Sequence, residues 1–225
     1  MLFWDPTFIL LIPAFILAAW AQSKLSRTYK RYSEEKSARG ITGANAARGI
    51  LDSEGLSSVQ IEKVSGNLTD HYDPRNRTLR LSQGVYSSDS IAAIGIAAHE
   101  VGHAIQHKNA YAPLSIRNAI VPVVNFGSFL AWPLFIIGFL LRTPVLIQIG
   151  IALFSGAVIF QLITLPVEFD ASKRALAQLS DGGYLTMEEI SGARRVLTAA
   201  ALTYVAAAAM AIIQLLRMIL LSRRR

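Results

Sequence analysis

Two histidines, His99 and His103, stand four residues apart in the pentapeptide HEVGH. The run from about Asp89 to Lys108 predicts a helix, and residues four apart in a helix lie on one face, about 6 Å apart along its axis. Two imidazoles placed in this way can bind one Zn²⁺, and Glu100 can act as general base on the zinc-bound water. The pentapeptide therefore predicts a metal-dependent hydrolase with His99 and His103 as zinc ligands and Glu100 as the catalytic residue.

The composition argues against a chance match. The chain has 4 histidines, and three of them, His99, His103 and His107, fall within nine residues. It has no cysteine, which excludes disulfides, cysteine-ligated zinc and thiol nucleophiles. Histidine together with aspartate or glutamate must then hold any zinc. A catalytic zinc takes three protein ligands plus water, so HEVGH needs one more ligand.

Four side chains could supply that ligand. His107 lies about 12 Å beyond His99 along the same predicted helix, which is too far unless the helix breaks. His71 lies on a strand that precedes the helix. Glu168 follows an apolar hairpin that must return the chain to the membrane face where HEVGH lies, which makes it the best candidate. Asp170 competes with it, although a helix would turn its side chain about 200° away from that of Glu168.

Hydropathy places the chain in a membrane. With 52% hydrophobic and only 16% charged residues, it is too apolar for a soluble domain of this length. Four segments are long enough, or nearly so, to cross a hydrocarbon layer of ~30 Å. These predicted spans are 7–21, 119–141, 145–167 and 199–221. Only Arg142, Thr143 and Pro144 separate the second span from the third, which predicts a tight helical hairpin.

Basic residues predict the orientation. No Lys or Arg precedes the first span, whereas Lys24, Arg27, Lys30 and Arg31 follow it, which favours a retained anchor over a cleaved signal peptide. Most other basic residues lie on the same side as the polar segment, which predicts a multi-pass protein of the inner membrane with its active site in the cytosol. Basic residues near membrane spans normally lie on the cytosolic side. If the fourth span crosses fully, Arg223 to Arg225 lie on the opposite side and are an exception.

The polar part, 22–118 plus 168–198, predicts a small α/β unit. We expect a helix over Thr42–Asp52 that is capped by Thr42 and closes near Gly55. A cap at Ser87, Ser88 or Asp89 should begin the HEVGH helix. The predicted strands are Val59–Val64, Leu68–Tyr72 and Thr78–Leu81, with a turn at Asp73–Asn76. With no repeat or linker visible, residues 1–225 are interpreted as a single membrane-embedded domain.

The formal net charge of +7 does not indicate nucleic-acid binding. The Lys and Arg residues cluster beside apolar segments, and the chain has no recognisable base-reading motif. The expected partner of these charges is the lipid bilayer.

Three motifs resemble a known family. They are Asp70-His71-Tyr72-Asp73-Pro74, the run from Ala97 to His107 around HEVGH, and Leu165-Pro166-Val167-Glu168-Phe169-Asp170-Ala171-Ser172. Together they are similar to the YugP-type bacterial membrane zinc metallopeptidases over nearly the whole chain. They resemble more distantly the HtpX/Ste24 membrane proteases, in which HExxH is joined by a glutamate from a later ExxxD motif. The resemblance implies that His99, His103 and Glu168 bind one catalytic zinc ion. Ser172 departs from the motif because it stands in the place of its aspartate.

The predicted fold is therefore a mainly α integral membrane protein with a zincin-like α/β domain, an HExxH helix and a short β-hairpin. The predicted function is zinc-dependent endopeptidase activity on membrane-associated peptides or proteins at the cytosolic face. An edge of the hairpin would hold the substrate strand. His71, Tyr72 or Arg174 could stabilise the oxyanion. Other membrane proteins, which the sequence does not identify, could be partners of the chain.

Two other functions remain alternatives. One is a non-catalytic scaffold or assembly factor stabilised by zinc, against which the presence of Glu100 argues. The other is a site-2-type intramembrane protease. The apolar stretch before His99 covers only Ile91–Ala98, which is too short to span a membrane.

Overall fold

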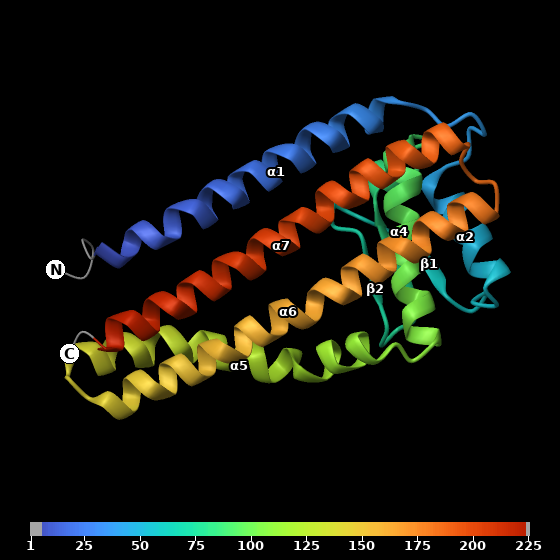
Figure 1. Cartoon of the computed structure of the whole chain (residues 1–225). Coiled ribbons are helices and arrows are strands. Elements are labelled where there is room, and N and C mark those ends of the chain that lie inside the picture. The colour runs from blue at the N-terminus through green and yellow to red at the C-terminus, as the bar shows by residue number, and fades with distance from the viewer. Residues whose placement is uncertain (1–5, 224–225) are drawn as a thin grey trace. The chain divides into compact units, whose positions relative to one another are not determined.

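The computed structural model describes residues 6–223, which form a mainly helical protein with a three-stranded sheet (Figure 1). A 3-10 helix, Pro6–Leu10, leads into the first α-helix. The helices are α1 (Leu11–Glu34), α2 (Gly43–Ser53), α3 (Gln83–Tyr86), α4 (Ile91–Lys108), α5 (Ala112–Leu140), α6 (Pro144–Asp181) and α7 (Met187–Arg223). The strands are β1 (Gln60–Val64), β2 (His71–Asp73) and β3 (Thr78–Ser82).

The chain forms two compact units. Of the described residues, we call 6–22, 115–166 and 202–223 the apolar unit, and 23–114 and 167–201 the polar unit. The HEVGH helix and Glu168 both belong to the polar unit. The interpretation of residues 1–225 as a single domain stays a prediction.

Within residues 6–223, four helical segments are long and apolar enough to cross a membrane, by length and composition. They are Pro6–Glu34, Ala112–Leu140, Pro144–Asp181 and Met187–Arg223, and they correspond to the four predicted spans. The predicted hairpin between the second and third of them is confirmed, because only residues 141–143 separate α5 from α6. Arg224 and Arg225, which entered the orientation argument, lie outside the described residues.

Pro166 lies inside α6, which continues without a break to Asp181. The 115–166 segment of the apolar unit ends at this proline, while the helix goes on into the polar unit's residues. Helices in membranes tolerate an internal proline, because neighbouring groups can satisfy the carbonyl that the proline leaves unbonded. Glu168 consequently lies within a continuous helix that runs from one unit into the other.

The sheet of the polar unit has the strand order β1-β3-β2. The predicted hairpin is confirmed, because β2 pairs with β3 in the antiparallel sense around a turn at residues 74–77. Asp73 fixes this turn by accepting hydrogen bonds from the backbone N–H of Arg75 and from Nδ2 of Asn76. The strand predicted over Leu68–Tyr72 instead occupies His71–Asp73, since Leu68 has a φ of 55°, which an extended strand does not allow.

The helix predicted over Thr42–Asp52 is confirmed as α2. The side chain of Thr42 accepts a hydrogen bond from the backbone N–H of Asn45, and Gly55 follows the helix with a φ of 69°. The start predicted for the HEVGH helix is wrong, because Ser90 caps α4 through the backbone N–H of Ala93. Residues 35–37 pair with residues 89–91 through backbone hydrogen bonds, which keeps Asp89 out of the helix.

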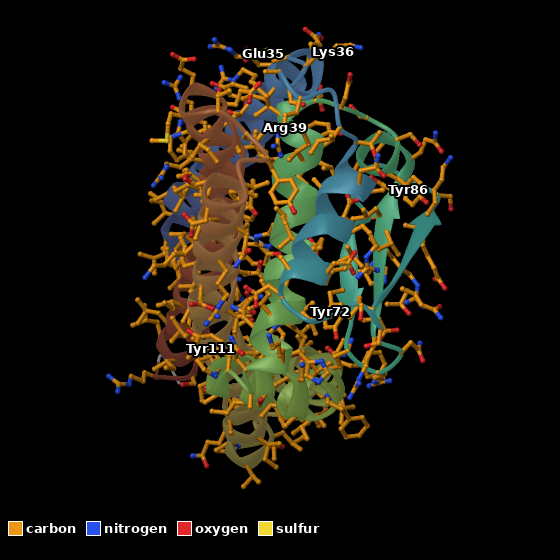
Figure 2. The ribbon with its side chains drawn as sticks, turned by 90° about the vertical axis from the view of Figure 1, so that its right-hand side faces the viewer. Glu35, Lys36, Arg39, Tyr72, Tyr86 and Tyr111 are labelled. Carbon is orange, nitrogen blue, oxygen red and sulfur yellow. The ribbon has the colours of Figure 1, made fainter. Side chains whose placement is uncertain are left out.

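Helix α4 lies at the centre of the polar unit. Figure 2 shows α2 and the sheet on one side of it, with α6 and α7 on the other. Its apolar side chains join the buried core of the unit, which includes Ile50, Leu51, Leu79, Leu81, Ile94, Val101 and Leu179. A helix packed on several sides holds its remaining polar side chains in fixed positions. In α4 those side chains include the two histidines and the glutamate of the HEVGH motif.

Candidate metal centre

The side chains of His99, His103 and Glu168 converge in the polar unit. One ligand atom from each lies within 4.8 Å of the other two. Oε2 of Glu168 is 3.3 Å from Nε2 of His99 and 3.7 Å from Nε2 of His103. Two atoms that both lie 2.0–2.2 Å from a tetrahedral zinc are roughly 3.3–3.6 Å apart. Two imidazole nitrogens and one carboxylate oxygen are a donor set that fits a catalytic zinc ion, and the two distances from Glu168 lie close to this spacing.

The other nitrogen of each histidine ring also has a partner. Nδ1 of His99 is 3.1 Å from Oγ of Ser172, and Nδ1 of His103 is 3.0 Å from Oε1 of Gln106. A histidine that binds a metal through one ring nitrogen commonly uses the other in a hydrogen bond that fixes the ring. Both rings are therefore oriented with Nε2 toward Glu168. Ser172 supplies a hydroxyl at the position where the related motif has a carboxylate.

The site is buried and favours a positive charge. Glu168 is 3% exposed and Glu100 is 9% exposed. Burial alone would lower the pKa of His103, but its contact with Glu168 and the negative charges of Glu100 and Glu168 outweigh this effect. The pKa of His103 is consequently raised above its ordinary value. The two carboxylates attract a cation to this point, and a bound zinc ion would balance their negative charge.

Gly102 lets α4 approach α6 closely. A Cβ atom added at this position would lie within 2.5 Å of the backbone carbonyl oxygen of Ala171, and within 3.1 Å of the carbonyl carbon and Cα of the same residue. Backbone atoms cannot move aside as a flexible side chain can. Gly102 therefore sets the distance between the helix that carries both histidines and the helix that carries Glu168.

Replacing this glycine should separate the ligands. Gly102→Ala is expected to destabilise the protein by about 1–3 kcal/mol, as overpacked substitutions do, and to weaken zinc binding. Thermal unfolding and zinc affinity, measured on the full chain in detergent, check both effects. Gly156→Ala is the matched control, because an added Cβ there meets no atom within 4 Å. A Gly102→Ala protein with wild-type zinc affinity would contradict this role.

The other predicted residues lie outside this ligand group. His107 is exposed, and its Nδ1 is 2.9 Å from the hydroxyl of Tyr72. Figure 2 labels Tyr72, which comes from β2. His71 is also exposed, and its Nδ1 is within hydrogen-bond distance of the carbonyl oxygen of Thr69. Arg174 donates to Asp170 and lies over the ring of Tyr111.

The sequence reasoning did not find Gln106. Its side chain is fully buried and joins three groups around the site. The available signal was its spacing, because residues three apart in a helix share a face and Gln106 follows His103 by three.

Comparisons with known proteins show the family of the chain. Residues 7–223 match the family described as "Putative neutral zinc metallopeptidase". The chain is 51% identical over 212 residues to "Putative membrane protease YugP" of Bacillus subtilis (strain 168), with 94% of each chain covered. No solved structure matches the chain significantly. The resemblance to the YugP-type proteins is thus confirmed. The chain belongs to the neutral zinc metallopeptidase family.

Proposed function

We propose that the chain is a zinc-dependent membrane endopeptidase in which His99, His103 and Glu168 bind one zinc ion. Glu100 is its general base. The observation that carries this proposal is the convergence of three ligand atoms, two from α4 and one from α6. Membership of a zinc metallopeptidase family supports it. The arrangement is zincin-like and of the gluzincin kind, with an HExxH helix and a glutamate ligand from a later helix.

The bound zinc ion and Glu100 would each carry part of the reaction. When bound, zinc polarises the scissile carbonyl and lowers the pKa of its water to about 7. The carboxylate of Glu100 takes a proton from the attacking water and later delivers it to the amide nitrogen of the leaving segment. Three protein ligands leave a fourth position open for water, whereas structural zinc sites are closed by four. The open position favours an enzyme over a zinc-stabilised scaffold.

The substrate would lie along β2. This strand has β3 on one side, and in the order β1-β3-β2 its other side is an edge. An extended peptide can pair with such an edge through backbone hydrogen bonds that tolerate many sequences. The same strand carries His71 and Tyr72, which with Arg174 stay our candidates for stabilising the oxyanion.

The reaction is assigned to the cytosolic membrane surface of the inner membrane. Among the described helices, α4 is not one of those long and apolar enough to cross a membrane. This argues against a site-2-type protease, in which the metal would lie among the spans. The substrates would be membrane-associated peptides or proteins, because four candidate spans hold the site at the bilayer.

Topology can be tested without removing any native thiol, because the chain has no cysteine. We expect a cysteine at Lys63, an exposed residue of β1, to resist a membrane-impermeant maleimide in intact cells. It should react after permeabilisation, whereas a cysteine at Arg223 should react from outside. Labelling of the Lys63→Cys protein in intact cells would contradict the cytosolic assignment.

Removal and return of zinc tests the proposed activity. The purified full chain in detergent is stripped with a chelator and incubated with an unfolded test protein, before and after addition of one equivalent of zinc. We expect hydrolysis to disappear with the metal and return with it. Full hydrolysis by the zinc-free chain would reject the proposal, and zinc binding without any hydrolysis would favour the scaffold.

A further inference from the structure

Gln106 connects the two helices of the candidate metal centre. It lies on α4, three residues after His103, and its side chain is 0% exposed. Its Oε1 is 3.0 Å from Nδ1 of His103. Its Nε2 donates to the backbone carbonyl of Val167 at 2.8 Å and to Oδ2 of Asp170 at 2.9 Å. Val167 and Asp170 flank Glu168 on α6, so this one amide contacts both sides of the third ligand.

These partners fix the orientation of the amide. A backbone carbonyl and a carboxylate oxygen can only accept hydrogen bonds, so both must face the NH₂ end of Gln106. The carbonyl end of the amide then faces His103. Because that end can only accept, Nδ1 of His103 must carry the proton. In a neutral imidazole the lone pair then lies on Nε2, which is the atom near Glu168.

Asp170 is itself held in place. Nε of Arg174, one turn further along α6, donates to the same Oδ2 that accepts from Gln106. The guanidinium of Arg174 lies 5.8 Å from the ring centre of Tyr111. Arg174, Asp170, Gln106 and His103 thus form a continuous hydrogen-bonded series. His99 is fixed less strictly, because the hydroxyl of Ser172 can either donate to its Nδ1 or accept from it.

We propose that Gln106 is a positioning residue that holds His103 in the Nδ1-protonated form, with Asp170 and the carbonyl of Val167 as its anchors. This inference rests on the proposed zinc site and adds the residue that orients one of its ligands, His103. Arg174 acts through Asp170 in this arrangement. Without the amide, either ring nitrogen of His103 could carry the proton. The distance between His103 and Glu168 would also no longer be fixed.

Zinc affinity tests the proposal with a readout that does not depend on hydrolysis. The dissociation constant is measured by competition with a chelator on the full chain in detergent. Gln106→Met, of similar size, should weaken zinc binding about 10- to 100-fold, the usual effect of removing a group that orients a metal ligand. Gln178→Met is the matched control. Gln178 also donates from one helix of the polar unit to a carboxylate, that of Glu54, which is not among the three candidate ligands.

A paired substitution separates positioning from general packing. Gln106→Glu alone places a second carboxylate against Asp170 and should bind zinc weakly. Adding Asp170→Asn turns the acceptor at position 170 into a donor, while the carboxylate introduced at position 106 still accepts from Nδ1 of His103. We expect the double variant to recover part of the lost affinity, because the carboxylate at position 106 still has no donor for the carbonyl of Val167. Unchanged affinity in Gln106→Met would overturn the proposal, and so would a double variant that binds zinc no better than Gln106→Glu alone.

The tautomer can also be read directly in the wild-type chain, so the proposal does not depend on a variant that folds. With ¹⁵N-labelled histidine the chain gives signals from only 4 histidines, assigned by replacing each in turn. In the zinc-free chain, at a pH where the ring of His103 is neutral, protonation at Nδ1 is the expected result, and a neutral ring protonated at Nε2 would overturn the proposal. A Glu168→Ala control distinguishes the two levels of the account. If that variant binds zinc normally, the metal site itself is wrong; if it loses zinc while Gln106→Met does not, only the role of Gln106 fails.

Discussion

Glu168→Ala is expected to abolish stable zinc binding. Glu168 is the carboxylate ligand of the proposed site, and its Oε2 lies within 3.7 Å of both histidine nitrogens. Removing a group that only orients a ligand already weakens metal binding about 10- to 100-fold, so loss of a ligand should exceed that range. Zinc content per purified chain, measured after dialysis, gives the result.

Thermal unfolding supplies a second measurement of the same loss. Zinc at about 100 times its dissociation constant should stabilise the wild-type chain by about 2.7 kcal/mol. The Glu168→Ala chain should gain no such stability. Glu188→Ala, which removes an exposed glutamate in the first turn of α7, is the control and should behave as wild type. Full zinc occupancy in Glu168→Ala would reject this ligand and favour His71 or Asp170.

Glu100→Gln is expected to stop hydrolysis while leaving zinc bound. Glutamine keeps the size of the side chain and removes its ability to take a proton from water. General base catalysis contributes about 10²- to 10⁴-fold in rate, so hydrolysis should fall by at least that factor. The zinc content should not change, because Glu100 is not one of the three converging ligand residues. Hydrolysis of an unfolded test protein and metal content are measured on the same sample.

The comparison with Glu188→Gln isolates the general base. This variant makes the same chemical change at an exposed position and should hydrolyse as fast as the wild type. If Glu100→Gln also keeps the wild-type rate, another group must activate the water. Loss of zinc in Glu100→Gln would mean instead that this carboxylate helps to hold the metal.

The parts of the fold that the sequence predicted are those set by local chemistry. Thr42 caps α2 with its own hydroxyl, and the turn after Asp73 is held by that residue's carboxylate. The four spans follow from the length of apolar segments alone. Convergence of Glu168 with HEVGH was expected because a tight hairpin between two spans returns the chain to one face. The structure brings these residues together.

The parts that were missed depend on contacts between distant segments. Ser90 rather than Asp89 caps α4, because pairing with residues 35–37 decides which of several polar residues is free to cap. The parallel pairing of β1 with β3 leaves no local sequence signal. In the sequence, nothing distinguishes Gln106 from other polar residues on a helix. Its role emerges only when Val167 and Asp170 are placed opposite its amide.

The central claim is that one zinc ion lies between His99, His103 and Glu168 with a position open for water. Anomalous X-ray diffraction at the zinc absorption edge, from crystals of the zinc-loaded full chain, tests it most directly. The account predicts one strong peak at about 2.0–2.2 Å from Nε2 of both histidines and from a carboxylate oxygen of Glu168, with a non-protein fourth ligand. A peak elsewhere, or a fourth protein ligand at this one, would contradict it.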